Sequence, residues 1–291
     1  MSDGAERLRL RAHAKINLTL DVLGRRADGY HEVRSVMQTI ALADHLEITT
    51  AARLSLDAQP AWLANEHNLV MRAARELQRY SGYRGGARIV LRKHIPVSAG
   101  LGGGSSDAAA TLRGLVALWG LHVPHATLVD IAATIGSDVP YFLWGGTALV
   151  AGRGEQVQPL SPLAPLDLVL VKPPEGVSTA RVFGRLSPDA YTAGAASASF
   201  IEAVLGPPDQ WRPHNALQET TQRLCPSVRE VLAALRASGA TPVLMSGSGP
   251  SCFGIFPGRP DAEVAAQAMR GHGWEAWATR TVDASAPVAQ P

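Results

Sequence analysis

The sequence contains few cysteines, few aromatic residues and little net charge. Only Cys225 and Cys252 occur among its 291 residues, too few for a disulfide framework or a four-ligand zinc site. This cysteine usage fits a reducing cytoplasm, and we expect both thiols to be buried without an assigned function. Aromatic residues make up 5% and the formal net charge is +2, a composition that does not favour nucleic-acid binding.

Long apolar segments are also missing. The first fifteen residues, MSDGAERLRLRAHAK, have no apolar core of the kind found in signal peptides. The longest stretch without Asp, Glu, Lys or Arg runs from Ala237 to Gly258 and contains three prolines. Prolines, glycines and serines there indicate turns and not a membrane span. We expect a cytoplasmic protein with no membrane partner, and its length favours two domains.

The N-terminal region alternates polar and apolar residues without a break. Apolar side chains occupy every second position from Arg7 to Val22, which predicts a half-buried strand or a bent hairpin. Lys15 and Asn17 therefore share the polar face of this segment. A further strand is predicted around Leu46 to Thr50.

A glycine-rich loop precedes a helical pattern in the middle of the chain. Residues Pro96 to Ser106 read PVSAGLGGGSS, and apolar residues then recur at helical spacing from Ala108 to Trp119. Glycine permits positive φ and close approach of the backbone to a polyphosphate, and helix N-termini attract anions. No Gly-Lys-Ser/Thr follows, and Ser105 replaces the last glycine of a dinucleotide pattern. The loop predicts an anion site, with a flexible hinge as the alternative, and we expect Ser105 or Ser106 to cap the helix.

The remaining pattern predicts an α+β protein. Helices are expected at Leu69–Tyr80 and Leu128–Ile135, and the glycine- and proline-rich stretch 152–165 suggests domains at residues 1–156 and 157–291. The second half reads as strand, helices, two strands, helix and strand, which favours a split βαβ arrangement. A capping box is predicted at Ser227–Glu230, and Ala190–Ser199 is expected to be a loop.

Three segments resemble the motifs of the GHMP kinases, the superfamily of galactokinase, homoserine kinase and mevalonate kinase. The loop Pro96–Ser106 resembles the second motif, Ala14–Leu18 the first and Leu244–Ser251 the third. Further segments are similar to the 4-diphosphocytidyl-2-C-methyl-D-erythritol kinases of the non-mevalonate (MEP) isoprenoid pathway, namely Arg26–His31, Gly136–Pro140 and Gly176–Thr179.

This resemblance covers nearly the whole chain and implies a fold and an activity. The fold would be a two-domain α+β kinase, with an N-terminal ATP-binding domain like a ribosomal-protein domain and a ferredoxin-like C-terminal substrate domain. The activity would be ATP-dependent phosphorylation of the 2-hydroxyl of 4-diphosphocytidyl-2-C-methyl-D-erythritol, with ATP and Mg²⁺ required.

The resemblance also implies site residues. Lys15 and Asp138 match the catalytic pair: Asp138 would accept the hydroxyl proton, and Lys15 would stabilise the charged carboxylate and the γ-phosphate. Taken alone, a lysine on a polar strand face is usually solvated, and an aspartate after a helix is usually a turn residue. The ATP-binding residues would be Asn68, Lys93, Pro96, Val97, Ser98, Ala99, Gly100, Leu101, Gly102, Gly103, Gly104, Ser105 and Ser106.

The substrate-binding residues implied in the same way are Asn17, Tyr30, His31, Thr179 and Phe183. Tyr30 would stack on the cytosine and His31 would bind its edge, although core packing and surface exposure are the ordinary roles of such residues. A helix N-cap is an equally good reading of Asn68. We assign no metal ligand, and we leave Asp107 open because a carboxylate in the first turn repels a phosphate.

Two alternative functions would each require a different feature of the protein. If the protein were another small-molecule kinase of the superfamily, its substrate would contain no base to stack on the Tyr30–His31 pair. A non-catalytic RNA-binding protein would need a broad basic, aromatic-rich face, which the composition does not favour. We expect a monomer or weak homodimer that binds small molecules and no nucleic acid.

Overall fold

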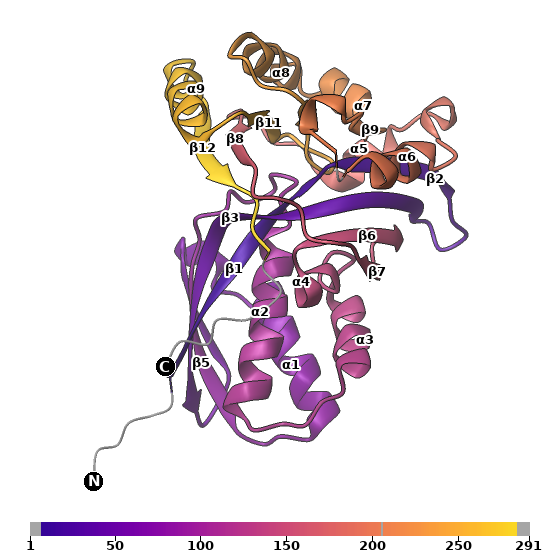
Figure 1. Ribbon diagram of the computed structural model, residues 1–291. Helices are drawn as coiled ribbons and strands as arrows, with labels where there is room; N and C mark the ends of the chain where they lie inside the picture. The colour runs from indigo at the N-terminus through magenta and orange to yellow at the C-terminus, as the bar shows by residue number, and fades with distance from the viewer. Residues whose placement is uncertain (1–6, 205, 284–291) are drawn as a thin grey trace.

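The computed structural model describes residues 7–204 and 206–283, so the outer ends of both predicted domains lie outside the described residues. It contains two sheets, each with helices against it, which form the lower and upper parts of Figure 1. No helix in the described ranges is long and apolar enough to cross a membrane.

The larger sheet is built around one long strand, β3 (His31–Ala51). β3 pairs antiparallel with β1 (Arg7–Asn17) and β2 (Thr19–Arg25), and also with β5 and β6. The strand predicted at Leu46–Thr50 is thus only the last part of a 21-residue strand. The other strands of this sheet are β4 (Ser55–Gln59), β5 (Gly86–Arg92), β6 (Thr147–Gly152), β7 (Gln156–Pro159) and β9 (His214–Asn215).

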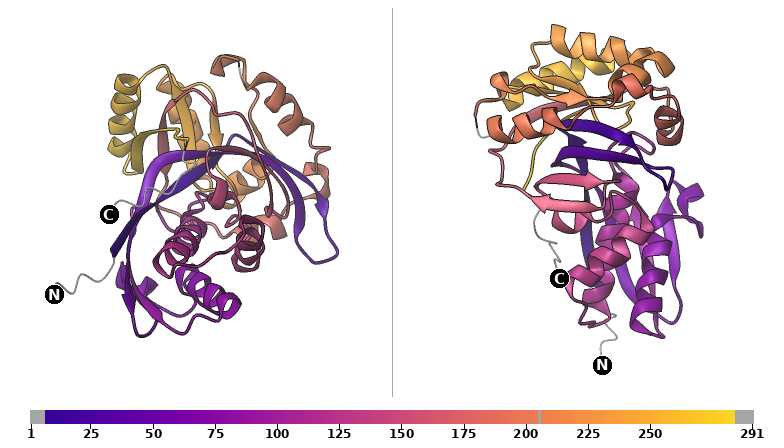
Figure 2. Two further views of the ribbon diagram at one scale, coloured as in Figure 1. Left: turned by 60° about the horizontal axis from the view of Figure 1, so that its bottom comes forward. Right: turned by 90° about the vertical axis from the view of Figure 1, so that its right-hand side faces the viewer.

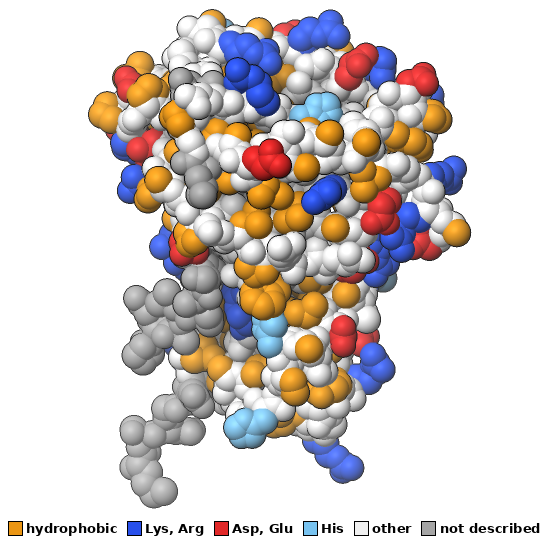
Figure 3. All heavy atoms as spheres, turned by 45° about the vertical axis from the view of Figure 1, so that its right-hand side comes forward, with side chains coloured by type: hydrophobic (Ala, Val, Ile, Leu, Met, Phe, Trp, Pro, Cys, Tyr) orange, Lys and Arg blue, Asp and Glu red, His pale blue; other side chains and the backbone are white. Residues whose placement is uncertain are grey.

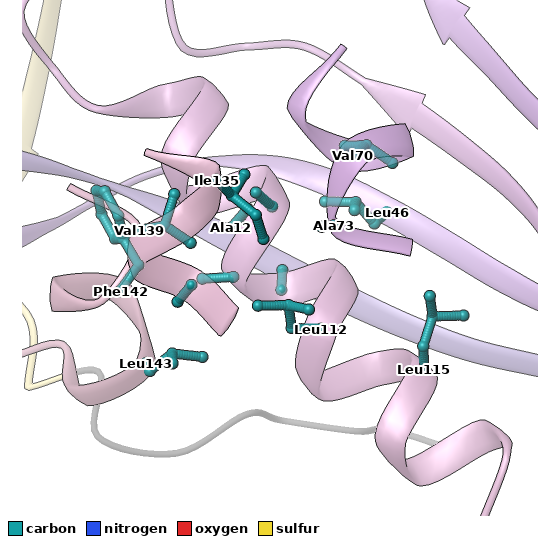
Figure 4. Packing of buried hydrophobic residues seen from close by; sticks show 14 of the residues in the cluster. Ala12, Leu46, Val70, Ala73, Leu112, Leu115, Ile135, Val139, Phe142 and Leu143 are labelled. Carbon is teal, nitrogen blue, oxygen red and sulfur yellow. The ribbon is translucent and has the colours of Figure 1, made fainter. Parts of the chain in front are cut away.

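Helices cover one face of this sheet and fill its core. The views of Figure 2 show the long strands curving around them, and Figure 4 shows apolar side chains from helix and strand packed together, among them Leu112 and Leu46. This cluster excludes a large apolar surface from water, which stabilises the fold. The helices here are η1 (Ala61–Leu63), α1 (Leu69–Ser81), α2 (Gly103–Leu118), α3 (His125–Ile135) and α4 (Tyr141–Trp144).

The smaller sheet is fully antiparallel and has the strand order β10-β11-β8-β12. In chain order this is a split βαβ arrangement, as predicted: β8 (Asp167–Lys172), helices, β10 (Val243–Met245), β11 (Cys252–Phe256), α9 (Arg259–Gly271) and β12 (Glu275–Arg280). The helices between β8 and β10 are α5 (Thr179–Gly184), η2 (Pro188–Ala190), α6 (Ala195–Ala203), η3 (Pro208–Gln210), α7 (Gln218–Leu224) and α8 (Ser227–Ala237).

A second apolar cluster joins the two sheets. Ile16, Val36 and Ile40 of the larger sheet pack with Leu170 and Phe253 of the smaller one. The middle of β3 is therefore buried on both faces, which explains why its sequence does not alternate. The boundary at residue 156 stays a prediction.

Three local predictions were wrong. Gly102, and not Ser105 or Ser106, is the N-cap of α2, in the left-handed conformation at φ +70°. The capping box at Ser227 does not form, because Ser227 Oγ donates to Glu175 at 2.7 Å instead. The expected loop Ala190–Ser199 contains the first turn of α6, which begins at Ala195.

Candidate active site

One large cavity, about 1450 Å³ in volume, lies between the two halves of the molecule. It is lined by the glycine loop, by the N-terminal strands and by residues of the C-terminal half. Most of the predicted site residues meet there: Lys15, Asn17, Tyr30, His31, Asn68, Lys93, Pro96 to Ser105, Asp138, Thr179 and Phe183. Ser106 is buried, at 3% exposure.

Lys15 enters the cavity at an irregularity in the strand pairing. The register between β1 and β3 shifts between His13 and Lys15, and the Lys15 amide donates to Leu101 O in the glycine loop at 3.0 Å. Such shifts re-aim a side chain out of the regular ladder. The irregularity thereby joins the first predicted motif to the second.

The Lys15 side chain is held by two oxygens. Its ammonium donates to Asn17 Oδ1 at 2.6 Å and lies 3.7 Å from Asp138 Oδ2. The side chain of Lys15 is only 3% exposed, against 30% for Asp138. Burial lowers the pKa of Lys15, an effect that the charge of Asp138 opposes. The predicted polar face is thus a buried polar network, and Asn17 Nδ2 extends it by donating to Ser35 Oγ at 2.7 Å.

Asp138 follows α3 in a short turn. Gly136 ends the helix, as predicted, and the buried side chain of Val139 anchors the turn. The carboxylate is left partly open to the cavity beside the ammonium of Lys15. A partly exposed carboxylate next to a buried cation has the position required of a proton acceptor for a bound hydroxyl.

The glycine loop needs its glycines for space as well as for conformation. A Cβ on Gly100, at φ +78°, would lie 2.4 Å from Ser246 O, and a Cβ on Gly102 would lie 2.7 Å from the ring of Phe142. The loop leads into α2, whose free N–H groups and positive dipole end favour an anion. Its backbone is held from the other side by Ser246 Oγ, which donates to Gly100 O at 3.1 Å.

The third predicted motif lies over the first two. Gly247, at φ +56°, leaves room for Lys15: a Cβ there would be 3.2 Å from Lys15 Nζ. Asn215 holds this segment in place by donating from Nδ2 to Met245 O and Gly247 O, at 2.8 Å each. The structure therefore brings three motifs, distant in sequence, to one catalytic lysine candidate.

A hairpin turn carries the predicted base-binding pair. The Arg26 amide donates to Tyr30 O at 2.8 Å, and Asp28 Oδ1 accepts from the Tyr30 amide at 3.1 Å, which closes the turn between β2 and β3. Tyr30 is 52% exposed, so it is not a core residue. The guanidinium of Arg153 lies 5.3 Å from the centroid of its ring, within range of a cation–π contact.

His31 faces two aromatic rings from the C-terminal half. Its ring centroid lies 5.0 Å from that of Phe183 and 6.0 Å from that of Tyr191, whose hydroxyl is 3.5 Å from His31 Nε2. Burial, with a smaller effect from the charge of Arg25, lowers the pKa of His31, which favours a neutral ring that can both donate and accept. Thr179 Oγ1 lies nearby in the cavity, 2.8 Å from Ser248 Oγ.

Asn68 and Lys93 line the glycine-loop side of the cavity but have local partners. Asn68 is the N-cap of α1: its Oδ1 accepts from the Val70 amide at 2.9 Å, and its Nδ2 donates to Leu63 O at 2.9 Å. Lys93 is buried and forms ion pairs with Asp44 and Asp107. Their roles toward a nucleotide stay predictions.

Several cavity residues were missed from the sequence. Arg153 and Ser137 come from the N-terminal half, and Tyr191, Leu186 and Ser248 from the C-terminal half. Ser137 and Ser248 lie within the segments Gly136–Pro140 and Leu244–Ser251, so the motifs contained them although no role was assigned to them. Tyr191 and Arg153 gave no such signal, because only the folded chain brings them to Tyr30 and His31.

The described residues include no group of three or more His, Cys, Asp or Glu side chains placed to hold a metal ion. Three carboxylates from the described part of the chain line the cavity: Asp28 is paired with Arg26, Asp107 with Lys93, and the partly exposed Asp138 with Lys15. Cys225 and Cys252 are buried, as expected.

Comparison with known proteins identifies the family. The model for the GHMP kinases N terminal domain matches residues 68–146, and that for the GHMP kinases C terminal matches residues 202–273. A 4-diphosphocytidyl-2-C-methyl-D-erythritol kinase from Pelotomaculum thermopropionicum is 45% identical over 284 residues, covering 93% of this chain and 96% of that protein. The chain belongs to the family of 4-diphosphocytidyl-2-C-methyl-D-erythritol kinases.

Two further proteins of this kinase family are similar to the chain. The kinase from Brevibacillus brevis is 41% identical over 279 residues, covering 91% of this chain and 93% of its own. A crystal structure of 4-(cytidine 5'-diphospho)-2C-methyl-D-erythritol kinase superposes with a TM-score of 0.82 at 38% identity, covering 94% of this chain and 98% of the other. A homoserine kinase from Cytophaga hutchinsonii shares the fold, with a TM-score of 0.73 at 18% identity over 97% of this chain and 96% of its own. The predicted two-domain GHMP kinase fold is confirmed.

Proposed function

We propose that this kinase transfers the γ-phosphoryl group of ATP to the 2-hydroxyl of 4-diphosphocytidyl-2-C-methyl-D-erythritol. The observation that carries the proposal is the single cavity in which the glycine loop, the Lys15–Asp138 pair and the Tyr30–His31–Phe183 group meet. The dimensions also fit, because small-molecule sites commonly occupy about 300–1,000 Å³ and this cavity must hold two substrates.

The glycine loop and the start of α2 bind the phosphates of ATP in this proposal. Positive φ at Gly100 and Gly102 exposes the backbone, and the N-terminal N–H groups of α2 point toward bound anions. Asn68 and Lys93 lie on the side where the nucleoside would bind. Phosphoryl transfer depends mainly on such positioning and on neutralisation of charge.

Lys15 and Asp138 perform the chemistry. The oxygen of the 2-hydroxyl attacks the γ-phosphorus while Asp138 accepts the proton of that hydroxyl. ADP leaves with the electron pair of the broken P–O bond. The ammonium of Lys15, 3.7 Å from the carboxylate, stabilises the charge that develops on the transferred group. Asn17, bonded to Lys15, fixes the direction of that ammonium and lies where the polyol end of the substrate would bind.

The cytidine end of the substrate binds between the hairpin and α5. Tyr30 and Phe183 offer ring faces for the cytosine, and His31 offers a donor and an acceptor for its edge. Arg153, which lies over Tyr30, adds a cation where the diphosphate would pass. Thr179 and Ser248 supply hydroxyls to the same region.

The chemistry of the cavity fits Mg²⁺ carried by the nucleotide. Mg²⁺ usually binds through one or two carboxylates together with substrate phosphates, so no dedicated cage of protein ligands is needed. Asp138 is the cavity carboxylate that would face such an ion. When bound, Mg²⁺ neutralises phosphate charge.

We further propose a cytoplasmic monomer or weak homodimer without a nucleic-acid partner. Charged side chains of both signs are interspersed on the face drawn in Figure 3, in contrast to a broad basic surface. Light scattering coupled to size exclusion would measure the mass of the particle, and tight RNA binding without kinase activity in a salt titration would contradict the proposal.

The proposed substrate is tested by measuring ADP release with four alcohols in parallel: the cytidyl-erythritol, homoserine, mevalonate and galactose. We expect turnover with the first alone. Activity on one of the other alcohols, without activity on the first, would overturn the proposal.

A further inference from the structure

Asp107 belongs to a buried group of charges next to the glycine loop. Lys93 Nζ donates to Asp107 Oδ2 at 2.7 Å and also forms an ion pair with Asp44. The side chains of Lys93, Asp44 and Asp107 are 7%, 0% and 3% exposed. Two carboxylates therefore share one ammonium away from water.

The three side chains come from different elements and adjoin the nucleotide side of the cavity. Asp44 lies on β3, Lys93 directly follows β5, and Asp107 is in the second turn of α2, not in the first turn as the sequence suggested. Lys93 and Asp107 both line the cavity, and Lys93 Nζ would be 3.1 Å from a Cβ placed on Gly103. A charge in this group therefore acts directly on whatever the loop binds.

The hydrogen bonds of the group are complete except at one atom. Asp44 Oδ1 accepts from the amides of His94 and Ile95, at 2.6 and 2.8 Å. Asp107 Oδ1 is buried, and no donor from the described residues reaches it. The ionised form of Asp107 would therefore be a second buried negative charge with one oxygen that lacks a donor, which is costly, and one proton on Asp107 removes that charge.

We propose that Asp107 carries a proton when the nucleotide binds, so that the group Lys93, Asp44 and Asp107 is neutral and does not repel the phosphates. Asp107 is then a positioning residue for the nucleotide: it keeps Lys93 in place beside the loop without adding negative charge. This inference rests on the proposed binding of ATP in the glycine loop.

The electrostatics agree with this geometry. Burial raises the pKa of Asp107 to about 8; the charge of Lys93 opposes this shift and the charge of Asp44 adds to it. The charged groups that face Asp107 from the packed strands are Asp44 and Lys93, and Lys15 reaches the same cavity paired with Asp138. Above about pH 8 Asp107 ionises, and the group gains one negative charge next to the phosphates.

The test is the affinity for ADP at pH 7 and pH 9, measured by calorimetry at constant ionic strength. We expect the wild type to bind ADP about tenfold more weakly at pH 9, the ratio for loss of one required proton with a pKa of about 8. In Asp107→Asn the remaining pair Lys93–Asp44 is neutral at both pH values. In Asp44→Asn the remaining pair Lys93–Asp107 is neutral at both pH values. Both variants should lose this tenfold dependence, and the matched control Asp130→Asn, an exposed carboxylate on α3, should keep it.

Titration of Lys15 and of the nucleotide affects ADP binding in the wild type and in all three variants alike. Comparing the variants with the wild type therefore removes these contributions from the measured pH dependence. A merely structural role for Asp107 would weaken binding equally at both pH values and leave the dependence intact in Asp44→Asn. Wild-type pH dependence in Asp107→Asn, or none in the wild type, would overturn the inference. Failure of the wild type to bind ADP at either pH would overturn the proposed function as well, whereas ADP binding without kinase activity would contradict the proposed function alone.

Discussion

Replacement of Lys15 by methionine separates catalysis from stability. The variant keeps an unbranched side chain, one atom shorter, but removes the ammonium that lies 2.6 Å from Asn17 Oδ1 and 3.7 Å from Asp138 Oδ2. In the proposed mechanism that ammonium, which is itself buried, faces the negative charge that develops in the transition state. Loss of one such group typically lowers kcat by about 10²–10³-fold, and we expect a fall of about 10³-fold here because Lys15 is nearly fully buried.

The effect of Lys15→Met on folding is expected to be small, because two contributions oppose each other. Removing a buried charge avoids its desolvation, and the remaining partner, Asp138, keeps access to solvent through a side chain that is 30% exposed. Asn17 Oδ1 loses its short hydrogen bond, at a cost of about 1–3 kcal/mol. Because the avoided desolvation offsets part of this cost, we expect a net loss below about 2 kcal/mol, equivalent to a fall in Tm of less than about 8 °C in a protein of this size.

The assay combines kcat from ADP release with the Tm of the same preparation and its affinity for ADP. We expect kcat to fall by about three orders of magnitude while the Tm and the ADP affinity change little. Lys15→Arg is the matched control that restores the charge with a different shape, and it should recover only part of the activity. A kcat for Lys15→Met within tenfold of the wild type would refute the assigned role of the ammonium.

Three further predictions follow from the cavity. Asp138→Asn should lower kcat by at least about 10²-fold and leave the affinity for ADP, measured without Mg²⁺, unchanged; an unchanged kcat would remove Asp138 as the base. Gly100→Ala, whose Cβ would lie 2.4 Å from Ser246 O, should weaken ADP binding by at least about tenfold in calorimetry, and wild-type affinity would show that the loop tolerates a side chain. Tyr191→Phe removes the hydroxyl 3.5 Å from His31 Nε2, so KM for the alcohol should rise by a few-fold with KM for ATP unchanged; equal changes in both would contradict a role at the base end.

The local parts of the site could be predicted from the sequence. Unbroken alternation placed Lys15 and Asn17 on one strand face, and the structure joins them by a hydrogen bond. The glycine loop before a helix indicated an anion site on physical grounds. Both features are local, since the period of a strand and the conformational range of glycine act within a few residues.

The remaining features depend on residues far apart in the chain. From the sequence alone, the strand face that carries Lys15 would be expected to face solvent. In the structure the segment around Gly247, more than 200 residues further along the chain, covers it. The Ser227 cap failed for a similar reason, because Glu175 offered its hydroxyl a charged acceptor from another element. Tyr191 approaches His31 only through the packing of the two halves.

The most direct test of the proposed function is the position of the new phosphate in the product. The enzyme is given one equivalent each of ATP and 4-diphosphocytidyl-2-C-methyl-D-erythritol, and the products are identified by phosphorus and carbon nuclear magnetic resonance. We expect ADP and a phosphomonoester on the 2-hydroxyl, with the diphosphate of the alcohol intact. Formation of a phosphomonoester at another hydroxyl, or release of inorganic phosphate without phosphorylation of the alcohol, would contradict the account.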